Sequence, residues 1–138
     1  MGITYLDSCV LIYAVEDDTE RGAAIRQRLA SAGEQHFVIS PLVKMECLVG
    51  PLRADDLALH DHYLDAFEQF GLVEITGDQF VRAAEIRARH RLAAPDALHL
   101  AAALAHRCDE LWTNDSRLQA ASHGLAIDVS GPAAADRH

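Results

Sequence analysis

Five short apolar runs along the chain have the pattern of buried β-strands. Each is about five residues long and is bounded by polar residues, glycine or proline, which is typical of strands rather than helices. The runs are "ITYLD" (3–7), "HFVIS" (36–40), "LVEIT" (72–76), "ELWTN" (110–114) and "LAIDV" (125–129). The sequence therefore predicts five strands, most of them far enough apart for a helix to lie between them.

The segments between these runs carry hydrophobic residues three or four positions apart, which is the spacing of amphipathic helices. Ser40 is suited to cap one helix at its N-terminus, with Pro41 at the first helical position. Gly50 and Pro51 are expected to separate that helix from the next, so that the two form a hairpin. Helices are predicted over residues 20–32, 41–50, 55–70, 78–91 and 95–106.

Alternating strands and helices place the chain in the α/β class. Helices that connect parallel strands cross over on either face of the sheet. We therefore expect a three-layer α/β/α sandwich around a central, mostly parallel sheet of four to five strands. A chain of 138 residues suits one hydrophobic core, so we expect one domain over 1–130 and a flexible C-terminal tail over 131–138.

Composition and charge narrow the class of function. No apolar run is long enough to cross a bilayer, and the N-terminus lacks the basic start of a signal peptide. The three cysteines form no CxxC pair, which fits a reducing cytoplasm. The net charge of −9 argues against holding nucleic acid by bulk charge. Nearly all of the basic residues are arginines, however, and a few well-placed arginines make forked contacts to phosphate.

Four acidic residues are predicted to meet at one end of the sheet. Asp7 ends the first strand and Asp115 follows the fourth, and ligands of parallel sheets bind beyond the carboxyl ends of the strands. Asp96 lies in the first turn of an alanine-rich helix whose N-terminus faces the same crevice and tolerates an anion. Glu46 lies on a helix that begins at the same end, and its side chain leans back toward that end.

The position of Glu46 depends on which face of its helix is buried. Leu42, Met45 and Val49 form an apolar stripe along the helix over 41–50. Glu46 lies on or beside this stripe, four residues after Leu42. We therefore expect the stripe to face the core and Glu46 to face the crevice.

Four carboxylates held close together repel one another unless a cation lies among them. Mg²⁺ and Mn²⁺ prefer oxygen ligands, and one or two such ions can activate water and stabilise charge on a phosphoryl group. Each acid also has an ordinary alternative, as a first-turn helix acid, a helix cap, an Asx-turn residue or a surface residue. Their joint occurrence at one sheet end favours a metal site.

The stretches that carry these acids resemble the PIN-domain family, in particular the VapC-type toxins of bacterial toxin–antitoxin pairs. They are "YLDSCVLIYAVE" with Asp7, "ISPLVKMECLVGPLR" with Glu46, "PDALHLAAALAH" with Asp96 and "LWTNDSRL" with Asp115. The resemblance extends over about residues 3 to 130. It implies a cytoplasmic, Mg²⁺- or Mn²⁺-dependent endoribonuclease that cleaves RNA by attack of water on a phosphodiester.

The resemblance also implies partners and residue roles. A homodimer or a hetero-oligomer with a small antitoxin is expected, with the third and fourth helices helping to form those surfaces. Asp7, Asp96 and Asp115 would bind metal, and Glu46 would bind metal or orient the attacking water. Residues beside these acids that would support them, or would simply cap helices, are Ser8, Thr113 and Asn114.

Two further features are left with open interpretations. His99 follows Asp96 by three residues, and we interpret it as a packed or hydrogen-bonded helix histidine rather than a metal ligand. Arginines crowd the helix over 78–91, either as a solvated face or as contacts to the RNA backbone; they are Arg82, Arg87, Arg89 and Arg91.

Two other functions compete with the ribonuclease. A metal-dependent phosphatase or a receiver-like phosphoacceptor would be built on Asp7. The stretch "DSC" lacks the second aspartate of a DxD pair, however, and Lys44 is badly placed for a receiver. A PIN scaffold without catalytic activity, acting through protein binding, also remains open.

Overall fold

The computed structural model describes residues 2–31, 33 and 36–129, and it has the predicted α/β architecture. The predicted tail over 131–138 lies outside the described residues. The elements are, in chain order, β1 (Ile3–Leu6), α1 (Ser8–Glu16), α2 (Glu20–Ala30), β2 (His36–Ile39), α3 (Pro41–Arg53), α4 (Leu57–Phe67), β3 (Gly71–Leu72), α5 (Gly77–His90), α6 (Ala94–Ala105), β4 (Glu110–Thr113), α7 (Ser116–Ala121) and β5 (Ala126–Asp128).

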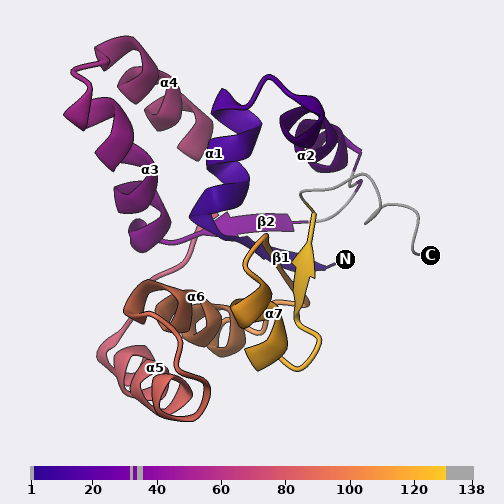
Figure 1. The fold of residues 1–138 in the computed structure, drawn as a ribbon, viewed down its shortest axis with the longest axis vertical. Coiled ribbons are helices and arrows are strands. Elements are labelled where there is room, and N and C mark those ends of the chain that lie inside the picture. The colour runs from indigo at the N-terminus through magenta and orange to yellow at the C-terminus, as the bar shows by residue number, and fades with distance from the viewer. Residues whose placement is uncertain (1, 32, 34–35, 130–138) are drawn as a thin grey trace.

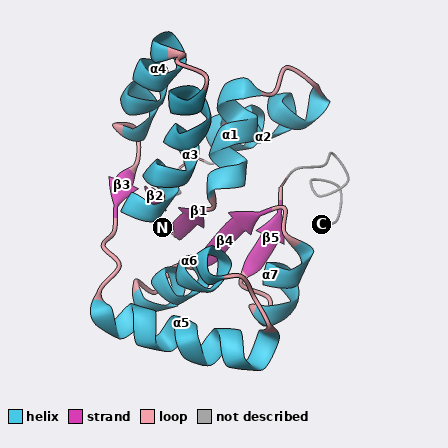
Figure 2. Cartoon of the chain, turned by 60° about the vertical axis from the view of Figure 1, so that its left-hand side comes forward, coloured by secondary structure: helices cyan, strands magenta, loops and turns pink. Residues whose placement is uncertain are grey.

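The strands form one parallel sheet in the order β3-β2-β1-β4-β5. The helices α1 to α4 lie on one side of this sheet and α5 to α7 on the other (Figures 1 and 2). This arrangement confirms the predicted three-layer sandwich. The strand order reverses direction next to β1, so the crevice beyond β1 and β4 is the place where such sheets bind ligands.

The predicted break between the third and fourth helices is wrong. Gly50 and Pro51 lie inside α3, which continues for two more residues, and Pro51 is buried. The chain turns instead at Asp55, whose φ of 53° is left-handed. Asp56 then caps α4, because its side chain accepts a hydrogen bond from the backbone N–H of Leu59 at 3.0 Å. The predicted helical hairpin therefore exists, but its turn is formed by Asp55 and Asp56 rather than by Gly50 and Pro51.

Short elements account for the other differences from the prediction. β3 contains only Gly71 and Leu72, although the backbone N–H of Val73 still donates to the carbonyl oxygen of Ile39 at 2.8 Å. The periodicity predicted neither α1 nor α7. Helices of nine and six residues are too short to display a clear helical period.

The buried face of α3 also differs from the prediction. Met45 is 56% exposed and Val49 is 36% exposed, whereas Val43 and Cys47 are buried. α3 has apolar residues on more than one face, so its sequence alone does not select the face that packs. Packing against α1 selects it, and the Sγ of Cys47 lies 3.9 Å from the carbonyl oxygen of Ser8.

Small side chains bring α6 deep into the core. Ala97, Ala102 and Ala103 are fully buried, and Leu100 is almost so. α6 packs against α5 on one side and approaches β4 on the other. Because alanine allows close approach, the polar side chain of His99 on this helix is also carried into the interior, where it is completely buried.

Candidate metal centre

The carboxyl ends of β1 and β4 bring a buried carboxylate to the sheet edge. Leu6 pairs with Trp112 in the parallel ladder, so Asp7 and Thr113 follow side by side. The backbone N–H of Asp7 donates to the carbonyl oxygen of Trp112 at 3.0 Å. Asp7 is only 6% exposed and Thr113 is fully buried. A carboxylate this deep requires compensating partners.

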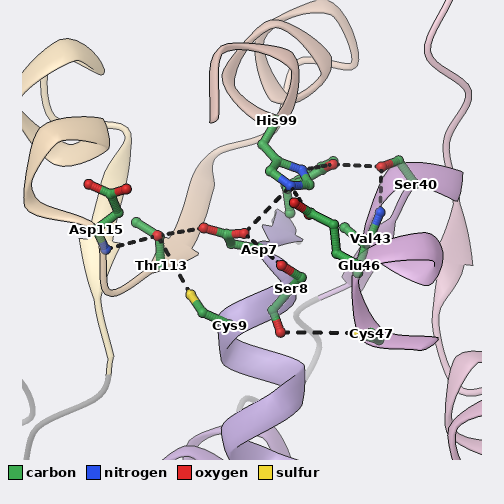
Figure 3. Close-up of polar contacts among 11 residues, drawn as sticks. Asp7, Ser8, Cys9, Ser40, Val43, Glu46, Cys47, His99, Thr113 and Asp115 are labelled. Carbon is green, nitrogen blue, oxygen red and sulfur yellow. Dashed lines mark hydrogen bonds and ion pairs between the residues drawn. The ribbon is translucent and has the colours of Figure 1, made fainter. Parts of the chain in front are cut away.

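Thr113 connects the carboxylate of Asp7 to the loop that holds Asp115. Its Oγ1 donates to Oδ2 of Asp7 at 2.7 Å and accepts from the backbone N–H of Asp115 at 3.1 Å (Figure 3). Asp115 also caps α7, because its Oδ1 accepts from the backbone N–H groups of Arg117 and Leu118 at 2.8 and 3.3 Å. The Asx-turn considered for Asp115 is present in the bond from Arg117, and it coexists with the position of Asp115 at the end of the sheet.

Asp96 adds a third carboxyl group from the first turn of α6. Burial, followed by the negative charges of Asp115 and Asp7, raises the pKa of Asp96 to about 6. A hydrogen bond with Asp115 acts in the same direction. Asp96 is half-buried, so its ionised form is poorly hydrated as well as close to like charges.

Glu46 reaches the same place from α3 through His99. The Nε2 of His99 lies 2.6 Å from Oε1 of Glu46 and 3.6 Å from Oδ1 of Asp7 (Figure 3). The imidazole thus stands between two of the four predicted acids. The structure therefore brings all four carboxylates to one end of the sheet, connected by two intervening side chains, His99 and Thr113.

A buried chain of hydrogen bonds continues behind His99. The Nδ1 of His99 lies 2.7 Å from the hydroxyl of Tyr5, and that hydroxyl lies 2.7 Å from Oγ of Ser40. Ser40 also accepts from the backbone N–H of Val43, in the first turn of α3. When His99 is protonated, it donates to Tyr5 and Glu46, and Tyr5 donates to Ser40. This chain fixes the orientation of the imidazole relative to Glu46.

Charge is unevenly balanced across the site. Burial opposes the charged form of His99, but its hydrogen bond with Glu46 and the charge of Asp7 outweigh burial and raise the pKa of His99. Burial likewise disfavours ionised Glu46, but the hydrogen bond and charge of His99 outweigh it and lower the pKa of Glu46. The contacts with Glu46 and Asp7 thus favour the protonated form of His99, whereas Asp96 lies against the like charges of Asp115 and Asp7.

The donor atoms fit a hard divalent cation. Among the described residues, Asp7, Glu46 and His99 offer potential ligand atoms that all lie within 4.8 Å of one another. Both nitrogens of His99 are engaged in hydrogen bonds, so the available donors are carboxylate oxygens. Oxygen donors beside an uncompensated carboxyl pair suit Mg²⁺ or Mn²⁺ better than softer ions.

The predicted supporting residues divide into two groups. Ser8 donates to Oδ1 of Asp7 at 3.4 Å, and its hydrogen bond to Glu46 helps to lower the pKa of Glu46. The side-chain amide of Asn114 instead donates to the hydroxyl of Tyr13 on α1, and among the described residues it bonds to no carboxylate. Asn114 thus ties α1 to the loop after β4.

The four arginines predicted on the helix over 78–91 also occupy different environments. The Nε of Arg87 donates to the carbonyl oxygen of Leu92 at 3.0 Å, which braces the turn between α5 and α6. Arg91 is exposed and follows α5 with a left-handed φ of 54°. Arg82 and Arg89 share one face, as their spacing predicts, and line the same cavity.

Sequence reasoning missed the contributions of Tyr5 and Ser40 to the site. Ser40 was interpreted only as a helix cap, a role that it also has. A signal for Tyr5 was present, because it precedes Asp7 by two residues and alternate strand residues share a face. No sequence pattern pairs Tyr5 with His99, which is 94 positions away.

Thermal unfolding without metal is expected to report the raised pKa of Asp96. A carboxyl whose pKa is higher in the folded state destabilises the fold increasingly as the pH rises from the unfolded value of 3.8 toward about 6. In EDTA at about pH 7.5, Asp96→Asn should therefore melt above the wild type, by roughly 2–4 °C because solvent screens a half-exposed carboxyl. At about pH 4.5 this difference should shrink markedly. An equal difference at both pH values would contradict the raised pKa.

Comparison with known proteins identifies the family of the chain. The PIN domain family matches residues 4–124, which is most of the chain, and the chain belongs to that family. No curated protein matches this chain significantly.

Solved structures with the same fold come from bacterial toxin–antitoxin systems. A toxin–antitoxin complex from Klebsiella pneumoniae has 26% sequence identity and a TM-score of 0.73, over 91% of this chain and 96% of that one. VapC20 from Mycobacterium tuberculosis, a toxin that cleaves the sarcin–ricin loop, has 16% identity and a TM-score of 0.74, over 86% of this chain and 94% of that one. DNA-bound VapBC from Salmonella typhimurium has 18% identity and a TM-score of 0.73, over 93% of this chain and 98% of that one.

Proposed function

We propose that this protein is the toxin of a toxin–antitoxin pair and acts as a metal-dependent endoribonuclease. The observation that carries the proposal is the meeting of Asp7, Glu46, Asp96 and Asp115 at the edge of the sheet in a PIN domain. The likeness to the Klebsiella pneumoniae toxin–antitoxin complex, at 26% identity, supports the toxin assignment.

The residues would divide the work as follows. Asp7, Asp96 and Asp115 would hold Mg²⁺ or Mn²⁺, with Glu46 as a further ligand or as the group that orients the attacking water. A bound divalent ion makes water a stronger nucleophile and offsets the charge of the phosphodiester. Thr113 holds the carboxylate of Asp7 in place, and His99 keeps Glu46 ionised and directed into the site.

We propose an antitoxin as the protein partner, forming a hetero-oligomer with this chain or with a homodimer of it. The excess of acidic residues suits a partner that presents basic side chains to the carboxylate site. The third and fourth helices expose apolar side chains that a partner would cover, among them Met45, Leu52, Leu57 and Leu64. No helix in the described part of the chain has the length and hydrophobicity to span a membrane.

The test of the proposed function is cleavage of labelled RNA under controlled metal content. We expect cleavage with Mg²⁺ or Mn²⁺, none in EDTA, and recovery when the metal is restored, because four carboxylates without a cation do not activate water. Expression without an antitoxin should halt bacterial growth. Cleavage that persists in EDTA would exclude the metal mechanism. Absence of cleavage of any RNA, combined with tight binding of a protein partner, would favour a scaffold.

A further inference from the structure

A cavity outside the carboxylate site lies between α5, α6 and α7. Its volume is about 370 Å³, within the range of sites that hold small ligands. Part of its lining is apolar and comes from all three helices: Ile86, Leu100, Leu104 and Ala121. The three helices form one layer on the same side of the sheet (Figure 2). An apolar lining of this size can accommodate the flat face of a nucleobase.

The charged lining of this cavity is opposite in sign to the protein as a whole. Arg82, Arg89, His90 and His123 can carry positive charge there, against the single carboxylate of Glu85, although the chain has a net charge of −9. Among the described residues, the guanidinium groups of Arg82 and Arg89 form no hydrogen bond or ion pair. Two unpartnered guanidinium groups can therefore accept an anionic ligand without breaking an existing contact, and their forked donors match phosphate oxygens.

Two imidazole rings add surface for stacking. His90 at the end of α5 and His123 after α7 approach edge to face, with ring centroids 6.1 Å apart and planes at 76°. Histidine is among the side chains on which unstacked RNA bases rest. The cavity thus combines phosphate donors, an apolar lining and planar rings, which together match a nucleotide better than an acidic peptide.

The cavity adjoins the carboxylate site through the helices that carry its acids. Leu100 follows Asp96 on α6 by four residues, and Ala121 follows Asp115 by six residues along α7. At 1.5 Å per residue these positions lie roughly 6 and 9 Å from the acids along the helix axes. The cavity wall therefore comes within about two helical turns of both acids.

We propose that this cavity binds one nucleotide of the RNA strand, next to the phosphodiester held at the carboxylate site. Arg82 and Arg89 are two helical turns apart, about 10 Å along α5, so they can contact successive phosphates of the strand beyond that phosphodiester. The inference rests on the proposed function, because it takes RNA as the substrate. It assigns Arg82 and Arg89 to substrate binding and leaves Arg87 to brace the helix turn.

The test measures binding apart from cleavage. A fluorescein-labelled, single-stranded RNA oligonucleotide of mixed sequence is titrated with the protein in EDTA, and anisotropy is followed at several salt concentrations. The test variant is Arg82→Gln with Arg89→Gln. The control is Arg53→Gln with Arg107→Gln, which removes the same charge from exposed arginines that line no part of this cavity. Thermal melts check that both variants fold.

The test variant should bind RNA about tenfold more weakly, and its slope of log affinity against log salt should fall by about 1.4, the value for two phosphate contacts on a single strand. The control should change far less. Restoring charge with Arg82→Lys and Arg89→Lys should recover the slope but only part of the affinity.

Equal losses in the test and control variants would overturn the proposal, as would an unchanged salt slope. Loss of binding to a purified antitoxin with unchanged RNA affinity would assign the cavity to a protein partner and overturn it too. If the arginine-dependent RNA binding is present but no metal supports cleavage, the proposed ribonuclease function fails while the nucleotide site stands.

Discussion

Replacing Asp96 by asparagine is expected to reduce RNA cleavage by about a thousandfold or more, because the neutral amide removes charge that holds the metal at the reacting phosphate. Burial and the like charges of Asp115 and Asp7 raise the pKa of Asp96, so a bound cation would strongly favour its ionised form. The measurement is single-turnover cleavage of labelled RNA at saturating Mn²⁺. Calorimetry should show weaker Mn²⁺ binding by the same variant.

Asp65→Asn is the matched control for this change. Asp65 lies on the exposed surface of α4, so the substitution removes the same charge far from the sheet edge. We expect its cleavage rate and its Mn²⁺ affinity to equal those of the wild type. If the Asp96→Asn variant cleaves RNA at the wild-type rate, or binds Mn²⁺ with unaltered affinity, this carboxylate does not bind the catalytic metal.

Replacing His99 by glutamine is expected to reduce cleavage by roughly 10- to 100-fold, the usual effect of removing a group that orients a metal ligand. His99 holds Glu46 at 2.6 Å and lowers the pKa of Glu46 by hydrogen bonding and by charge. Without the imidazole, the pKa of Glu46 should rise. The acidic limb of the pH profile for kcat/KM should then move to higher pH, which a purely structural role would not produce.

Tyr5→Phe separates this positioning role from simple loss of stability. It removes the hydroxyl between His99 and Ser40 but leaves the contact between His99 and Glu46. Both variants should lose about 1–3 kcal/mol of stability, because each leaves buried polar atoms unpaired. Only His99→Gln should move the acidic limb. The same acidic limb in both variants would mean that His99 acts on activity through the stability of the fold alone.

Local patterns were sufficient to predict the class of fold and the meeting of the four acids at one end of the sheet. Apolar runs too short for helices alternate with amphipathic segments, and that alternation leaves a parallel sheet between helices as the simplest arrangement. Asp7 directly follows β1 and Asp115 comes two residues after the end of β4, so the topology of such a sheet carries both to the same end. For these residues the position in the chain nearly fixes the position in space.

Sequence patterns gave wrong predictions where the local sequence allowed two structures equally well. α3 is apolar on more than one face, and its sequence favoured Met45 and Val49 as the core although Val43 and Cys47 are buried. Gly50 and Pro51 had the signature of a helix break, yet the helix continues through them. In both cases contacts with α1 and α4, which the local sequence does not contain, decided between the alternatives.

The sequence by itself determined the α/β class, the strand ends and the carboxylates that lie beyond them, because these follow from the periodicity and direction of single elements. Only the tertiary structure decided that His99 would lie against Glu46, with Tyr5 and Ser40 hydrogen-bonded behind it. The protonation of a buried imidazole depends on which partners surround it. Those partners come from β1, α3 and the residue before α3, and packing alone brings them to α6.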